Sequence, residues 1–138
     1  MMENVVELEV RWGECDPFQI VFYPNFFSWY DHCAWKLFEA AGFGPKLLKE
    51  RFGYHGMPLV DAQSNFIRPV RARDRLAIAS RVTYWGTSSF KITHRVTKDG
   101  EAMAEGIETR VWTIAYPDDP SRPKAAPIPR DLIETMDR

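Results

Sequence analysis

Residues 13–25, GECDPFQIVFYPN, separate a strand-like pattern from a helix-like pattern. Gly13 and the pair Asp16-Pro17 are typical of a turn, whereas Pro24 followed by Asn25 is typical of a helix start, with Asn25 as the N-cap. An aromatic and apolar run joins the two. The stretch therefore predicts that the carboxylate of Asp16 is held in a turn close to the beginning of a helix.

Regular patterns on both sides of this turn predict the main elements. Before it, alternating apolar residues over 6–12 indicate a strand with one buried face. After it, apolar residues recur every three or four positions up to Gly42, which predicts a helix of about four to five turns that is enclosed on more than one side. A second, short helix is expected over 45–51, ending at Gly53. The apolar positions of the long helix are Phe26, Trp29, Tyr30, Cys33, Ala34, Leu37, Phe38 and Ala41.

The rest of the chain reads mainly as strands. Asp99-Gly100 predicts a hairpin, and Gly106 is a candidate β-bulge. Prolines over 117–129 predict an irregular tail, followed by a short helix over 130–136. One apolar helix followed by antiparallel strands predicts a single α+β domain, 1–138, in which an antiparallel sheet curls round the helix. The strand patterns cover 57–68, 76–84, 90–97 and 101–115.

Composition excludes several classes of function. Apolar residues make up 45% and charged residues 27% of the 138, an ordinary globular balance. The formal net charge of −1 gives no general electrostatic case for binding nucleic acid or a membrane. No apolar run approaches the ~20 residues that a bilayer requires, and no signal-peptide pattern is present, so we expect a cytoplasmic protein. Cys15 and Cys33 have no metal-ligand spacing and are expected to be reduced thiols.

Asp16 allows two interpretations. An Asp before Pro is ordinary turn chemistry, and its short side chain often accepts hydrogen bonds from nearby backbone N–H groups. Alternatively, Asp16 faces a pocket, where it attacks a carbonyl or deprotonates a water molecule while the N–H groups at the helix start hold the developing oxyanion.

Other chemical signals are weak. The three histidines are scattered, and His94 lies on an apolar strand face, which is typical of a hydrogen-bonded core residue. No serine-hydrolase, phosphate-loop or zinc-protease motif is present. A run of arginines over 68–75 is either a solvated edge or a phosphate-binding face.

The sequence resembles the hotdog-fold acyl-CoA thioesterases, in particular the 4-hydroxybenzoyl-CoA thioesterase family of the Pseudomonas type. The resemblance is most specific at Gly-x-Cys-Asp-Pro (13–17) and Val-x-Tyr-Pro-Asn (21–25), and extends more weakly over nearly the whole chain. It implies a five-stranded antiparallel sheet wrapped around one long central helix. It also implies two subunits that pair to build two active sites, with further assembly into a tetramer.

The resemblance also implies roles for individual residues. Asp16 falls on the catalytic carboxylate, acting as nucleophile or general base. Tyr23 falls on the residue whose backbone N–H polarises the thioester carbonyl, and Asp31 on the acid that receives the 4-hydroxyl of the acyl group. Neither a metal nor a redox cofactor is implied.

Some positions depart from that family. Gly86-Thr87-Ser88 replaces a basic run, so contacts to the phosphates of CoA are expected to move to Arg71, Arg73 or Lys91. Near the acyl pocket, Met57 replaces a threonine and Asp61 replaces a serine. The thioesterase class is therefore expected more firmly than the 4-hydroxybenzoyl substrate.

The expected function is hydrolysis of an aromatic, 4-hydroxybenzoyl-type, or short acyl-CoA thioester. Two alternatives stay open at this point. A hotdog enoyl-CoA hydratase would pair an acid with a histidine, and no histidine stands beside Asp16. A non-catalytic acyl-CoA-binding module also stays open, because Gly86-Thr87-Ser88 replaces the basic run of the family.

Overall fold

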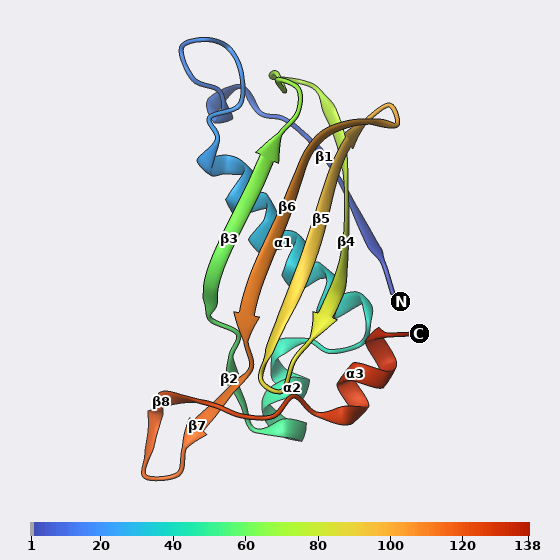
Figure 1. The fold of residues 1–138 in the computed structure, drawn as a ribbon. Helices are drawn as coiled ribbons and strands as arrows, with labels where there is room; N and C mark the ends of the chain where they lie inside the picture. Colours follow the sequence, from blue (N-terminus) through green and yellow to red (C-terminus); the bar gives the residue numbers. More distant parts are fainter. Residues whose placement is uncertain (1) are drawn as a thin grey trace.

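The computed structural model describes residues 2–138. Its main feature is a five-stranded antiparallel sheet in the order β1-β4-β5-β6-β3, which curves round helix α1 (Figure 1). This is the hotdog architecture, and it confirms the predicted α+β fold. The elements are β1 (Asn4–Glu9), α1 (Pro24–Ala40), β3 (Leu59–Phe66), β4 (Arg75–Trp85), β5 (Ser89–Lys98) and β6 (Glu101–Val111).

Helix α1 is buried where the recurrence of apolar residues places its stripe. Its N-terminal half packs against Val10, Leu76 and Ile78, and its C-terminal half packs in a second cluster with Phe90 and Ile92. The predicted short helices are both present, as α2 (Pro45–Phe52) and α3 (Arg130–Met136), and they close one end of the sheet (Figure 1). The buried residues of α1 are Phe26, Trp29, Tyr30, Cys33, Ala34, Leu37 and Phe38.

Two expectations at the start of the chain were wrong. Trp12 does not continue the first strand: it begins a 3₁₀ turn, η1 (Trp12–Glu14), and the residue is 78% exposed. Asn25 is not the N-cap of α1, because Tyr23 occupies that position and Pro24, which has no N–H to leave unpaired, takes the first helical position. The Asn25 amide instead donates to the Glu14 carbonyl at 2.8 Å.

The proline-rich tail is more regular than expected. Strand β8 (Asp119–Ala125) pairs with β7 (Thr113–Tyr116), which also pairs with β2 (Tyr54–Gly56) in a three-stranded sheet. Within residues 2–138, β8 pairs with β7 alone, so its prolines lie on an edge where a missing N–H is tolerated. The single strand expected over 101–115 is divided at Trp112, whose N–H donates to the Ser88 carbonyl at 2.7 Å.

Gly106 is not a bulge. It pairs in register with Ser64 on β3 and with His94 on β5. A Cβ at this position would lie 2.4 Å from the ring of Tyr30, so the glycine allows that ring to approach the sheet. Gly106 is therefore explained by side-chain packing.

Two further observations bear on the class of protein. Cys15 and Cys33 are free thiols, as expected. Within residues 2–138, no helix has both the length and the apolar character required to cross a membrane.

Candidate active site

Asp16 lies in a tight turn that the chain makes just before α1. The Phe18 N–H donates to Asp16 Oδ1 at 2.8 Å, and the Gln19 N–H donates to the Asp16 carbonyl at 2.9 Å. Gln19 has a positive φ of 67°, as a sharp reversal of the backbone requires. One carboxylate oxygen therefore has the turn-forming role that an Asp before Pro commonly has.

Glu14 fixes this turn against the beginning of α1. One of its carboxylate oxygens accepts the Trp29 Nε1–H at 2.9 Å, and the other accepts the Arg11 N–H at 2.8 Å. Its carbonyl accepts the N–H of Phe22 and the side-chain amide of Asn25. Because Asn25 and Trp29 belong to α1, these bonds set the distance between the Asp16 turn and the helix.

Asp16 also lines a small cavity. This cavity has a volume of about 100 Å³ and lies between the turn and the loop that leads to β4. Asp16 Oδ2 has no hydrogen-bond partner among the described residues. The two interpretations of Asp16 are thus compatible, since one oxygen holds the turn and the other is free beside a cavity lined by Trp12, Cys15, Gln19 and Ala72.

The start of α1 adds an orphan donor and an apolar groove. The Tyr23 N–H donates to no backbone carbonyl within residues 2–138, as is usual at a helix N-terminus. The groove beside Tyr23 has a volume of about 240 Å³. It is lined by Ile20, Val21, Tyr23, Phe26, Phe66, Ile67, Arg68, Pro69 and Val70.

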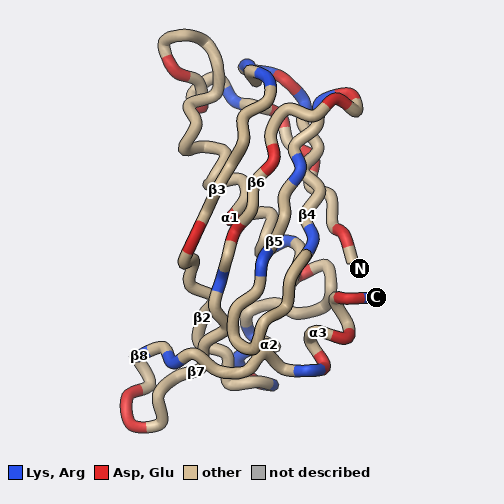
Figure 2. Tube along the Cα trace, viewed as in Figure 1, with Lys and Arg blue, Asp and Glu red and all other residues tan. Residues whose placement is uncertain are grey.

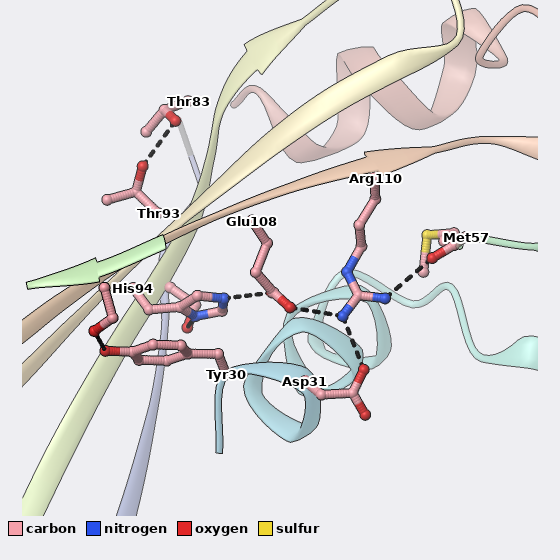
Figure 3. Close-up of polar contacts among 10 residues, drawn as sticks. Tyr30, Asp31, Met57, Thr83, Thr93, His94, Glu108 and Arg110 are labelled. Carbon is pink, nitrogen blue, oxygen red and sulfur yellow. Dashed lines mark hydrogen bonds and ion pairs between the residues drawn. The ribbon is translucent and has the colours of Figure 1, made fainter. Parts of the chain in front are cut away.

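Asp31 lines a separate pocket between α1 and β3. The pocket has a volume of about 370 Å³ and is lined mainly by the first two turns of α1 and by β3. Asp31 Oδ1 accepts a hydrogen bond from Arg110 Nη2 at 2.8 Å (Figure 3). The Asp31 side chain is 60% exposed, whereas that of Arg110 is 5% exposed.

Beneath Arg110 lies a buried chain of polar groups. Arg110 Nη2 also donates to Glu108 at 2.8 Å, and Glu108 contacts His94 Nε2 at 2.7 Å. Burial would raise the pKa of Glu108, but the hydrogen bond from His94 and the charge of Arg110 outweigh burial and hold that pKa below its ordinary value. Burial would likewise lower the pKa of Arg110, but Glu108 and Asp31 hold it above its ordinary value.

His94 is a hydrogen-bonded core residue, as its position on an apolar strand face predicted, whereas Glu108 and Arg110 were not predicted as part of the site. Both point from β6 toward α1, on the same strand face as the buried Trp112. Opposite charges two residues apart on a face that also carries a tryptophan are a signal that could have identified this pair.

Met57 and Asp61 do not meet in the Asp31 pocket. The Met57 side chain is buried in the core, and its carbonyl accepts a hydrogen bond from Arg110 Nη1 at 3.0 Å. Asp61 is exposed on β3 and contacts Gln63 at 3.0 Å, while its neighbour Ala62 lines the pocket.

The candidate phosphate-binding residues lie at two ends of the sheet. Arg71 and Arg73 flank Ala72, which lines the Asp16 cavity, and both are exposed. Lys91 is exposed near the start of β5, beside Tyr84 on β4 and therefore at the other end of the sheet (Figure 1). Figure 2 shows acidic and basic residues scattered over the whole trace.

Comparisons with known proteins agree with the fold. The family model of the Thioesterase-like superfamily matches residues 10–135. The chain is 29% identical over 136 residues to 4-hydroxybenzoyl-CoA thioesterase from Pseudomonas sp. (strain CBS-3), with 94% of each chain covered.

Solved structures extend the comparison. A mutant of 4-hydroxybenzoyl-CoA thioesterase in complex with 4-hydroxybenzoyl-CoA superposes with a TM-score of 0.86 at 27% identity, covering 97% of this chain and 98% of that one. A gentisyl-coenzyme A thioesterase superposes with a TM-score of 0.81 at 28% identity, covering 98% and 100%. The fold and the family match agree, and the chain belongs to the thioesterase-like superfamily.

Proposed function

We propose that this protein is an acyl-CoA thioesterase that hydrolyses an aromatic, 4-hydroxybenzoyl-type, or short acyl-CoA. The observation that carries the proposal is the carboxylate of Asp16, which lines a cavity and uses one oxygen to hold its turn, while the other has no hydrogen-bond partner within residues 2–138. Similarity to two aroyl-CoA thioesterases supports the substrate class.

The proposed chemistry needs a nucleophile and a group that stabilises negative charge. The thioester carbonyl lies over the start of α1, where the Tyr23 N–H and the positive end of the helix dipole stabilise the oxyanion. Asp16 either attacks the carbonyl, giving a mixed anhydride that water then cleaves, or removes a proton from the attacking water. In both routes the C–S bond breaks, and CoA leaves as a thiolate that takes up a proton.

A second copy of the chain is part of the proposal. Strand β3 is an edge strand, and it exposes Leu59, Val60 and Phe66. An exposed apolar edge is a template for pairing with another strand. We infer a dimer built through β3, in which the partner covers the Asp31 pocket beside this strand; the tetramer and the cytoplasmic location stay predictions.

The test is release of CoA from 4-hydroxybenzoyl-CoA. Asp16→Asn keeps the size of the side chain but removes its ability to accept a proton or form an anhydride, and we expect the rate to fall by roughly 10²-fold or more. Asp118→Asn, in the turn between β7 and β8, is the matched control and should retain the wild-type rate.

The outcomes separate the competing functions. Equal rates for wild type and Asp16→Asn would remove Asp16 from the mechanism. Tight binding of several acyl-CoAs without turnover would identify a binding module, and addition of water to crotonyl-CoA would identify a hydratase.

A further inference from the structure

A chain of polar side chains runs from the middle of the sheet to the Asp31 pocket. Ser80 Oγ lies 2.6 Å from His94 Nδ1, and His94 Nε2 lies 2.7 Å from Glu108. Arg110 then joins Glu108 to Asp31, with both distances at 2.8 Å (Figure 3). These side chains thus connect the three central strands β4, β5 and β6 to helix α1, which lines the pocket.

These polar side chains are costly to bury. The side chains of His94, Glu108 and Arg110 are 0%, 3% and 5% exposed. Buried ion pairs are usually no more stabilising than apolar residues of the same volume, because desolvation offsets the attraction. Stability alone is therefore a weak reason for charges at these positions, and their geometry points to a role at the pocket.

Three hydrogen bonds hold the guanidinium group of Arg110 in place. Its Nη2 is shared between the two carboxylates, and its Nη1 donates to the Met57 carbonyl at 3.0 Å. A planar guanidinium fixed by three hydrogen bonds has one orientation. Asp31 is more than half exposed and would otherwise sample several rotamers. Its bond to Arg110 uses Oδ1, so Oδ2, which has no partner among the described residues, is presented in one position.

The pocket presents carboxylates and little positive charge. Asp31 and Glu108 both line it, and they share one guanidinium group, that of Arg110. Asp31 Oδ2 has no hydrogen-bond partner among the described residues. A carboxylate oxygen without a donor favours a hydrogen-bond donor and repels an anion.

We propose that Arg110 is a positioning residue that fixes Asp31, so that the pocket selects acyl groups carrying a hydrogen-bond donor, such as a phenolic hydroxyl, and rejects acyl groups carrying a carboxylate. This inference rests on the proposed function for the class of ligand. Asp31 makes the contact that selects the acyl group. Arg110, supported by Glu108 and His94, holds Asp31 in the position that this contact requires.

The test measures binding, so that it does not depend on turnover. Three CoA thioethers, which cannot be hydrolysed, serve as probes: phenacyl-CoA, 4-hydroxyphenacyl-CoA and 4-carboxyphenacyl-CoA. Isothermal titration gives the ratio of Kd values with and without the substituent. For wild type we expect the hydroxyl to tighten binding roughly tenfold, as a hydrogen bond to a charged group does, and the carboxylate to weaken binding.

Variants separate positioning from a structural role. Arg110→Met and Asp31→Asn should each reduce the hydroxyl preference to near unity, and the double variant should show no further loss. Arg51→Met removes a surface ion pair with Asp131, which also has a 2.8 Å contact, and should leave the preference unchanged. If Arg110→Met does not fold, Arg110→Met combined with Glu108→Gln removes both buried charges and tests the same contact.

The outcomes are distinct from those of the proposed function. Wild type without a hydroxyl preference, an unchanged preference in the Arg110 variants, or additive losses with Asp31→Asn would each overturn the inference, even if acyl-CoA is hydrolysed. Absence of turnover would overturn the proposed function, while the Kd ratios would still decide the role of Arg110.

Discussion

At the scale of single residues, the packing of Tyr30 depends on one glycine. The Tyr30 ring stacks on His94 with centroids 4.8 Å apart, and its hydroxyl contacts Ser64 at 2.8 Å. Burial raises the pKa of Tyr30 to about 12, so this hydroxyl keeps its proton. The ring can reach both partners only because residue 106 has no Cβ.

We therefore predict that Gly106→Ala destabilises the protein. The added Cβ would lie 2.4 Å from one ring atom and 2.6 Å from another, so the ring or strand β6 must shift, at a cost of about 1–3 kcal/mol. Urea unfolding measures the change. Gly13→Ala is the control, because its added Cβ would meet no atom within 4 Å. Equal unfolding midpoints for the two variants would show that β6 accommodates the methyl group easily.

The same residues show what sequence reasoning can and cannot predict about the site. Asp16 could be placed because the turn and the helix start that flank it are close in sequence. Arg110 could not be paired with Asp31, because the two lie 79 positions apart and meet only when β6 packs on α1. Periodicity shows that Arg110 is on a buried face, but not which side chain faces it.

At the scale of elements, local periodicity predicts α1 and the large sheet well, because each element has its own repeating pattern. It fails for β8, where prolines hide a strand whose pairing with β7 is settled by the hairpin between them. It also says little about which edge of the sheet is free, since the order β1-β4-β5-β6-β3 is set by how the strands pack round α1.

The free edge at β3 gives a prediction about assembly. Val60 is 60% exposed on this strand, so Val60→Glu would place a carboxylate at the proposed dimer contact. Two-fold symmetry makes the charge enter twice, and we expect the dimer dissociation constant to rise more than tenfold, on the order of the cost of like charges facing each other. Sedimentation velocity over a range of concentrations measures the change.

The matched control lies on the opposite edge of the same sheet. Val5 is 53% exposed on β1, and Val5→Glu should leave the association unchanged. If Val5→Glu dissociates the protein and Val60→Glu does not, the copies pair through β1 and the proposed interface is wrong.

At the scale of the whole molecule, the buried row of polar side chains joins α1 to the five-stranded sheet. It also makes the stability of the protein depend on pH. The pKa of Glu108 is held below its ordinary value of 4.5 in the folded protein, so the unfolded chain binds a proton there more readily than the folded one. The contribution of Glu108 is therefore complete above pH 4.5 and is lost as the pH falls through the lower, folded-state pKa. Acid should loosen the contact between α1 and β6.

We predict that wild type loses stability on acidification more steeply than Glu108→Gln. At neutral pH the variant is less stable, because Arg110 loses a charged partner, but the difference between the two proteins should shrink as the pH falls below 4.5. One group contributes at most about 1.4 kcal/mol per pH unit to the slope. Urea unfolding at a series of acidic pH values measures both curves.

Glu134→Gln provides the comparison, because the Glu134 side chain is 63% exposed and forms a surface pair with Arg130, its one ion pair among the described residues. A surface pair of this kind contributes little, so its curve should run parallel to that of wild type. If the curves of Glu108→Gln and wild type also run parallel through the acidic range, the pKa of Glu108 is the same in the folded and the unfolded protein. The ion pair with Arg110 would then not be what couples α1 to the sheet.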